Sequence, residues 1–166
     1  RQFQLKVAVL DPAAAELACA SDFGLEAIPG FLEDYPPAGR QFDLVTLCQT
    51  IDHLTDASGS LAKIRQVVAP GGFFFVDIVD FRAAYLRNRS VEGAIKIDHP
   101  YYFTEDTATA LLRRAGFRIL ATNFAADHLH VGYLCQPATP EPDALPESAH
   151  TREFFREIRH IQNAKA

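Results

Sequence analysis

The 166-residue chain contains no methionine and no tryptophan, and it has only three cysteines, Cys19, Cys48 and Cys135. Their odd number and wide spacing fit neither a CxxC metal pair nor the disulfide framework of a secreted protein. We therefore predict a reduced, cytoplasmic protein in which these thiols serve as small, buried apolar side chains. The absence of an initiator methionine is typical of a piece of a longer polypeptide.

The sequence also lacks a basic excess and any long hydrophobic run. Its 16 Lys and Arg against 21 Asp and Glu give a formal charge of −5, which argues against a nucleic-acid partner. Its apolar runs, such as residues 73–76, have the length of a strand rather than of a membrane span. Hydrophobic residues make up 48% of the chain, which is enough for the core of one domain.

What the chain does contain is an alternation of strand and helix patterns. A stripe of Leu61, Ile64 and Val67 predicts a helix that the breaker at residues 70–72 ends. The strand at residues 42–48 is almost uniformly apolar, which favours burial of both its faces. The expected strands are residues 5–10, 25–28, 42–48, 73–79, 117–124 and 130–136.

Two further helices have recognisable ends. Asp11 is suited to be the N-cap of an alanine-rich helix at residues 13–20, with Pro12 at its first position. Thr104 is suited to cap a helix that Gly116 closes. Residues 80–99, in contrast, show a weak pattern and predict an irregular, basic stretch.

Strands that alternate with helices predict an α/β fold with a mainly parallel sheet and right-handed crossovers. The link at residues 125–127 is too short for a crossover, so the last two strands are expected to form an antiparallel hairpin. Residues 1–136 then make up the α/β domain, residues 137–148 a Pro-rich linker, and residues 149–166 an amphipathic helix. The apolar side of this helix is formed by Phe154, Phe155, Ile158 and Ile161.

Four stretches resemble, in order, the class I S-adenosylmethionine (SAM) dependent methyltransferases, especially those that act on small molecules. Residues 7–12 (VAVLDP) are similar to that family's second strand and residues 42–45 (FDLV) to its fourth. Residues 51–54 (IDHL) and 69–72 (APGG) resemble its leucine-glutamate-histidine and proline-glycine-glycine motifs, and residues 102–117 its last helix. The resemblance implies a Rossmann-like sheet, SAM as cofactor, and methyl transfer to an O, N or C nucleophile of a small molecule.

The family's first strand and its glycine-rich loop have no counterpart before Leu5, so the resemblance implies that the first β-α unit is absent from this chain. In the family that strand lies in the middle of the sheet. The strands at residues 5–10 and 42–48 would then lack a common neighbour, and unpaired buried backbone groups cost about 1–3 kcal/mol each. We therefore expect a longer parent chain, or a second copy in a homodimer, to supply the strand.

The resemblance also implies which residues bind the cofactor. Asp11, followed by Pro12, ends a strand where a carboxylate can accept two hydrogen bonds from a ribose diol, although it can also merely cap the next helix. Leu32 and Glu33 stand where the family packs and reads the adenine, and Glu33 is equally well explained as a surface residue.

By the same resemblance, the end of the strand at residues 42–48 is expected to lie beside the methionine part of SAM and the methyl group. There Gln49 offers two donors and an acceptor, while Cys48 is either a neighbour of the cofactor or buried filler. His53 occupies the histidine position of the family motif, where it acts either as a general base or as a residue that orders the loop.

On the acceptor side, His99 is a second candidate base, with a satisfied loop histidine as the alternative. Tyr101 and Tyr102 follow it and are candidates for stacking on or hydrogen bonding to the substrate. Arg82 would suit a phosphate or carboxylate on the substrate, with a solvated surface arginine as the default.

Three other functions compete with methyl transfer, and one of them is a related class I enzyme that uses SAM for another reaction. A methyltransferase-like module that binds a partner instead of a cofactor would use the tail helix in a groove. A nicotinamide-dependent oxidoreductase is disfavoured because the sequence has no GxGxxG and no Tyr-xxx-Lys pair. His128 and His130 alternate along one strand, but no third ligand is evident beside them, so no metal site is predicted.

Overall fold

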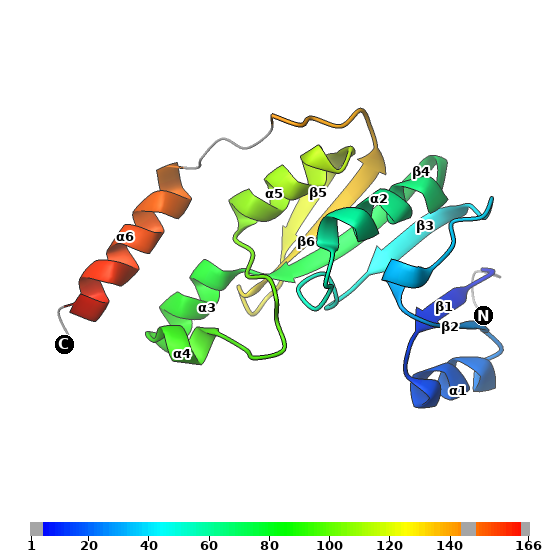
Figure 1. The fold of residues 1–166 in the computed structure, drawn as a ribbon, viewed down its shortest axis with the longest axis horizontal. Coiled ribbons are helices and arrows are strands. Elements are labelled where there is room, and N and C mark those ends of the chain that lie inside the picture. The colour runs from blue at the N-terminus through cyan, green and yellow to red at the C-terminus, as the bar shows by residue number, and fades with distance from the viewer. Residues whose placement is uncertain (1–4, 144–148, 164–166) are drawn as a thin grey trace. The chain divides into compact units, whose positions relative to one another are not determined.

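A computed structural model describes residues 5–143 and 149–163 (Figure 1). The chain divides into two compact units, residues 1–38 and residues 39–166, and each is described by itself. Across the described ranges, no helix is both long and apolar enough to cross a membrane.

The first unit is a β-α-β element. Strand β1 (Ala8–Asp11) pairs in parallel with strand β2 (Glu26–Pro29), and helix α1 (Ala14–Asp22) connects the two. A short 3-10 helix, η1 (Leu32–Asp34), follows β2. Because parallel strands place their carboxyl ends at one edge, Asp11 and η1 follow strand ends on the same edge of this small sheet.

The predicted cap of α1 is wrong. The N-cap residue is Ala13, which makes no side-chain capping bond, and Asp11 Oδ1 instead accepts a 2.7 Å hydrogen bond from the Ala13 N–H. Pro12 has no N–H, so the first backbone donor that the carboxylate can reach lies two residues further on. Pro12 therefore precedes the helix rather than opening it.

The second unit contains a mixed sheet in the order β3-β4-β6-β5. Strands β3 (Phe42–Leu47) and β4 (Val68–Val79) are parallel, while β6 (His130–Pro137) runs antiparallel to both β4 and β5 (Phe117–Phe124). The predicted C-terminal hairpin is therefore confirmed, and its last strand lies in the interior of the sheet.

Helices α2 (Ala57–Val67) and α5 (Glu105–Arg114) are both drawn in front of this sheet in Figure 1. The predicted stripe of α2 is buried, and alternate residues of β4 share the core with it. Thr104 caps α5 in a capping box with Thr107, and Gly116 follows its C-cap with a φ of +82°, as predicted. The largest side chains of the core are Tyr133, Phe74, Phe117, Ile51, Leu61 and Ile64.

The other face of the sheet is more open, and here the prediction of a doubly buried strand is wrong. Leu44 of β3 is 55% exposed, and its ladder partner Phe73 is 39% exposed, whereas Phe74 is completely buried. In the described part of the chain, β3 forms a ladder with β4 alone, and β1 with β2 alone. The apolar pattern of β3 would suit a strand buried on both faces, but within the second unit α2 and α5 lie on one face of this sheet.

The breaker at residues 70–72 lies inside β4 instead of ahead of it. Phe42 pairs with Val68 and Leu44 with Phe73, so the strand bulges out between these two ladder positions. Gly71 has a φ of +79°, and a Cβ on Gly72 would lie 3.0 Å from the Asp43 carbonyl oxygen. The glycines therefore allow a close strand approach at a bulge.

The stretch predicted to be irregular forms two helices, α3 (Phe81–Asn88) and α4 (Val91–Ala94). Their N-caps are Asp80, whose side chain accepts from the Ala83 N–H, and Ser90, whose hydroxyl accepts from the Gly93 N–H. The prediction was wrong because the basic residues of this stretch made a short apolar stripe on α3 difficult to recognise. That stripe consists of Phe81, Ala84 and Tyr85, all buried.

The C-terminal helix predicted from the sequence is present as α6 (Ala149–Asn163). Phe154 and Ile158 pack with Phe81 and Tyr85 of α3 in one apolar cluster. Phe155, in contrast, is 53% exposed and does not belong to the buried side. The linker predicted at residues 137–148 lies partly outside the described residues, and the domain boundaries stay a prediction.

Candidate functional site

The loop after β3 is fixed by one carboxylate of the neighbouring strand. Asp77 of β4 accepts two 2.7 Å hydrogen bonds from Gln49, one from its backbone N–H and one from its side-chain amide. Gln49 adopts a left-handed φ of +51°, which this pairing holds in place. Asp77 was missed in the sequence, although an acidic residue inside the apolar run FFFVDIV was a usable signal.

Cys48 stands at the same strand end and is exposed, so its reading as buried filler is wrong. Partial burial of the thiol and the nearby negative charge of Asp77 both raise the pKa of Cys48. The thiol therefore stays protonated and neutral near pH 7. Cys19 is exposed as well, and of the three cysteines only Cys135 is buried, which raises its pKa to about 12.

The two predicted histidines come together with a residue that the sequence interpretation had left out. The Nδ1 atom of His99 lies 3.1 Å from Oδ2 of Asp52, and the side chains are only 8% and 9% exposed. The ring of His53 meets the His99 ring edge-on, with the centroids 4.4 Å apart. His53 is 41% exposed, and its Nδ1 lies 3.2 Å from the backbone carbonyl oxygen of Asp98.

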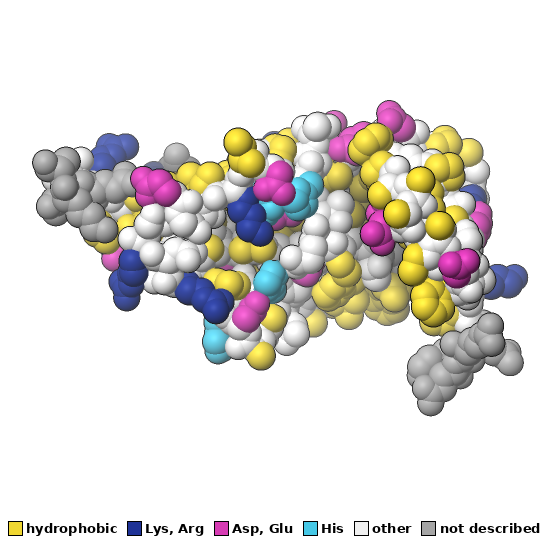
Figure 2. All heavy atoms as spheres, turned by 90° about the horizontal axis from the view of Figure 1, so that it is seen from below, with side chains coloured by type: hydrophobic (Ala, Val, Ile, Leu, Met, Phe, Trp, Pro, Cys, Tyr) yellow, Lys and Arg dark blue, Asp and Glu magenta, His cyan; other side chains and the backbone are white. Residues whose placement is uncertain are grey.

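Tyr101 and Tyr102 both line a cavity of about 170 Å³ together with His99 and Asp52. The Tyr101 hydroxyl donates to the Thr55 carbonyl oxygen at 3.1 Å, and the Tyr102 hydroxyl bonds to backbone groups of Lys96. Both hydroxyls therefore order the surrounding loops, and the rings are what the tyrosines offer to a ligand. Figure 2 shows a face of the molecule where histidine side chains lie beside acidic ones among apolar groups.

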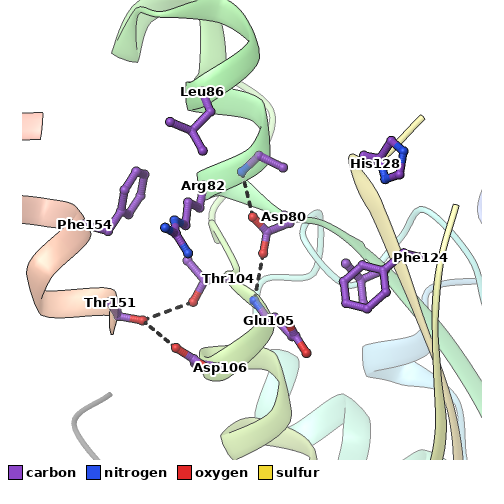
Figure 3. Close-up of a pocket in the computed structure, with 12 residues that line it drawn as sticks. Asp80, Arg82, Leu86, Thr104, Glu105, Asp106, Phe124, His128, Thr151 and Phe154 are labelled. Atoms are coloured by element: carbon purple, nitrogen blue, oxygen red, sulfur yellow. Dashed lines mark hydrogen bonds between the residues drawn. The ribbon is translucent and has the colours of Figure 1, made fainter. Parts of the chain in front are cut away.

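Arg82, the third predicted substrate residue, lies in a different cavity of about 390 Å³ between α3, α5, α6 and the hairpin (Figure 3). Figure 3 shows its side chain reaching from α3 toward Thr104, with Thr151 of α6 on the far side. Asp80 also lines this cavity and accepts from the backbone N–H groups of Ala83 and Glu105, at 2.7 and 2.9 Å. The structure thus separates Arg82 from the two tyrosines.

The cofactor residues predicted in the first unit follow the ends of β1 and β2. Asp11 ends β1 and is followed by Pro12, while Leu32 and Glu33 form most of η1. The Gly30 N–H donates to the Asp11 carbonyl oxygen at 3.2 Å, which ties the two strand ends together. The predicted cofactor residues thus form two sets, with this one in the first unit and Cys48 and Gln49 in the second.

The hairpin histidines have the carboxylate neighbour that the sequence interpretation did not find. His130 Nδ1 pairs with Asp127, and the Asp127 carboxylate also accepts from the N–H groups of Leu129 and His130. His128 takes a left-handed φ of +57° in the turn. Among the residues that the structure describes, three potential metal ligands gather only at Asp52, His53 and His99, not on this hairpin.

Residues 1–122 match the family model of a methyltransferase domain, and no curated protein matches the chain. Among solved structures, a SAM-dependent methyltransferase from Thermotoga maritima is 20% identical, with a TM-score of 0.64 over 78% of this chain and 72% of that one. A protein from Pyrococcus horikoshii is 15% identical, with a TM-score of 0.68 over 82% and 73%. A glycopeptide N-methyltransferase crystallised with SAM is 16% identical, with a TM-score of 0.63 over 83% and 75%. These similarities confirm the predicted Rossmann-like α/β fold.

Proposed function

Since the chain belongs to the methyltransferase-domain family, whose cofactor is S-adenosyl-L-methionine, we propose that it serves methyl transfer from this cofactor to a small-molecule acceptor. The observation that supports the acceptor side is the buried contact between His99 and Asp52 at the wall of a small cavity. A cavity of about 170 Å³ suits part of a small molecule better than a macromolecule.

The side chains at the strand ends fit the cofactor chemically. One oxygen of Asp11 is engaged by the Ala13 N–H, so the other can accept from a ribose hydroxyl. Gly30 leaves open space where a side chain would begin, since a Cβ there would meet nothing within 4 Å. Leu32 and Glu33 follow as adenine neighbours, and Pro12 shapes the turn behind Asp11.

In the second unit, Gln49 and Cys48 would hold the methionine end of the cofactor. Asp77 occupies one of the two amide donors of Gln49, and the amide oxygen remains as an acceptor for an ammonium group. The raised pKa of Cys48 keeps its thiol neutral, so it packs beside the sulfonium without attacking it. When bound, the cofactor supplies a methyl group that its sulfonium already activates.

His99 is the proposed group that receives the acceptor's proton. A carboxylate beside Nδ1 fixes the neutral imidazole with its hydrogen on Nδ1 and leaves the Nε2 lone pair available to a hydroxyl or amine. Only acceptors that start protonated need such a base, so a hydroxyl or an amine is favoured over a carbon nucleophile. His53 packs against the ring and holds its orientation.

Each of β1 and β3 has one ladder partner among the described residues, which supports a further proposal about partners. We propose that a strand from a longer parent chain, or from a second copy, pairs with both. Cofactor binding is then expected to be stronger within the full natural polypeptide than in the 166-residue chain alone. Equal affinities, together with a monomer in sedimentation, would contradict this part.

The test of the proposed function is binding of S-adenosylhomocysteine, measured by calorimetry on the chain and on its full natural polypeptide. Asp11→Asn should weaken binding by at least about tenfold, because a charge-assisted hydrogen bond contributes about 1.5–3 kcal/mol. Asp22→Asn, an exposed acidic residue at the end of α1, is the matched control and should leave affinity unchanged.

Transfer of a labelled methyl group to a panel of hydroxyl and amine acceptors then identifies the acceptor class. Equal binding in both aspartate variants would remove Asp11 from the site. Absence of binding in the full polypeptide would favour the alternative, a non-catalytic module that binds a partner. Against that alternative, the apolar side of α6 already packs on α3 of its own chain instead of remaining available for a partner.

A further inference from the structure

The cluster formed by Asp52, His53 and His99 has a second chemical capacity besides proton transfer. We infer that these three side chains form a binding site for one divalent transition-metal ion such as Zn²⁺. Each offers one ligand atom, and the three atoms lie within 4.8 Å of one another. Two imidazoles and one carboxylate are a ligand set that zinc commonly uses in proteins.

The distance between the two buried ligands supports a preformed site. Zinc bonds of about 2.0–2.2 Å at a tetrahedral angle separate neighbouring ligand atoms by about 3.3–3.6 Å. Nδ1 of His99 and Oδ2 of Asp52 lie 3.1 Å apart, so little movement would place both atoms on one ion. Because more than nine-tenths of each side chain is buried, little freedom remains to be lost when the ion binds.

His53 is the adjustable third ligand. Its Nδ1 lies 3.2 Å from the Asp98 carbonyl oxygen, which can only accept, so Nδ1 carries the hydrogen and Nε2 keeps a free lone pair. A ring N–H donated to a backbone carbonyl is the usual support of a metal-binding histidine. The side chain is 41% exposed and can rotate to close the remaining distance.

The surrounding charge also favours a cation. Oδ2 of Asp98 lies 3.9 Å from the His53 ring nitrogen, which adds a second carboxylate beside that of Asp52. A fourth position of the ion would face the cavity that Tyr101 and Tyr102 line, where water can complete the coordination.

The metal site and the proposed base share the same side chains. An ion on Nδ1 of His99 moves the imidazole hydrogen from Nδ1 to Nε2, so the Nε2 lone pair is no longer available to serve as the described base. The consequence for activity rests on the proposed function, and there Zn²⁺ is expected to inhibit methyl transfer. Binding itself is measured with neither cofactor nor acceptor, so failure of one proposal leaves the other standing.

The test is a calorimetric Zn²⁺ titration of the 166-residue chain carrying Cys19→Ser and Cys48→Ser, which removes the exposed thiols as competing ligands. One ion per chain is expected. His53→Ala should raise the Kd by at least about tenfold, the smallest loss typical of disturbing a metal site. The matched control is His160→Ala, since His160 is an exposed histidine on α6 that lies outside both the cluster and the cavity.

Asp52→Asn is a second variant, and circular dichroism will show whether it folds; the exposed His53 carries the test in either case. Replacement of Zn²⁺ by Co²⁺ should give the visible absorption of a tetrahedral ion, lost in His53→Ala. Absence of binding, an unchanged Kd in His53→Ala, or an equal loss in His160→Ala would each overturn the inference.

Discussion

Two histidine–carboxylate pairs contribute to the wall of the same small cavity, the first through both His99 and Asp52 and the second through His130 alone, and they are built in different ways. His99 and Asp52 come from distant parts of the chain and are 8% and 9% exposed. His130 and Asp127 are three residues apart on a hairpin and are 32% and 38% exposed. The first pair needs the complete fold, while the second needs only its own turn.

The difference lies in what else each carboxylate does. Asp127 is an acceptor for backbone N–H groups of its turn, and these bonds, together with His130, lower the pKa of Asp127 to about 2. The Asp52 carboxylate, in contrast, contacts the His99 ring. Asp127 accepts hydrogen bonds from the backbone and so stabilises its turn. Asp52 accepts from the imidazole of His99 at the cavity wall and so sets the tautomer of that ring.

The largest expected effect is on activity, to which the pair of His99 and Asp52 should contribute. His99→Gln should lower kcat by about 10²–10⁴, the usual contribution of a positioned base, with the affinity for S-adenosylhomocysteine unchanged. His160→Gln, an exposed histidine on α6, is the control that should leave kcat alone. A normal kcat in His99→Gln would reduce His99 to a loop-ordering residue.

The second largest effect is a difference between the two histidine–carboxylate pairs in their contribution to stability. Asp52→Ala leaves the buried Nδ1–H of His99 without an acceptor and should lower the free energy of unfolding by about 1–3 kcal/mol. Asp127→Ala should have a smaller effect, because water can replace the exposed partner. Urea unfolding of both variants beside the parent chain measures this difference, and equal losses would remove the distinction between the pairs.

The smallest expected effect is a pH dependence of stability that arises from Asp127 of the hairpin. The pKa of Asp127 is lower in the folded state, so its stabilising contribution is present above the ordinary pKa near 3.8 and is lost as the pH falls toward 2. The unfolding midpoints of the parent chain and Asp127→Asn should therefore converge between pH 4 and pH 2. A constant difference across that range would contradict the assignment.

Much of the fold could be predicted because it depends on local patterns. The hairpin followed from a link too short for a crossover, and the family from four short motifs in order. Local patterns also misled. Because Pro12 has no N–H, the Asp11 carboxylate accepts its hydrogen bond from Ala13 instead of capping the helix. The basic residues of 80–99 made the short apolar stripe of α3 difficult to recognise in the sequence.

The site was predictable only in part, since tertiary contacts assemble it. His53 and His99 could be named from chemistry and motif, but nothing local in the sequence shows that Asp52 faces His99. Likewise, Arg82 lies on α3 and Tyr102 in the loop between α4 and α5, and the two residues line different cavities. Contacts between side chains that are distant in the sequence cannot be predicted from the pattern of either segment alone.

Asp80 joins the beginnings of two helices. Its carboxylate joins the first turns of α3 and α5 through Ala83 and Glu105, and the Phe81 N–H bonds to the Phe103 carbonyl oxygen at 2.8 Å. Residues 81–104 therefore leave and rejoin the sheet domain at one place, as a closed loop whose length affects its closure entropy only weakly. This stretch, which carries His99 and both tyrosines, is thus anchored at its two ends by one set of hydrogen bonds, while side-chain contacts such as His99 with Asp52 and Tyr85 with Phe154 tie its interior to the rest of the unit.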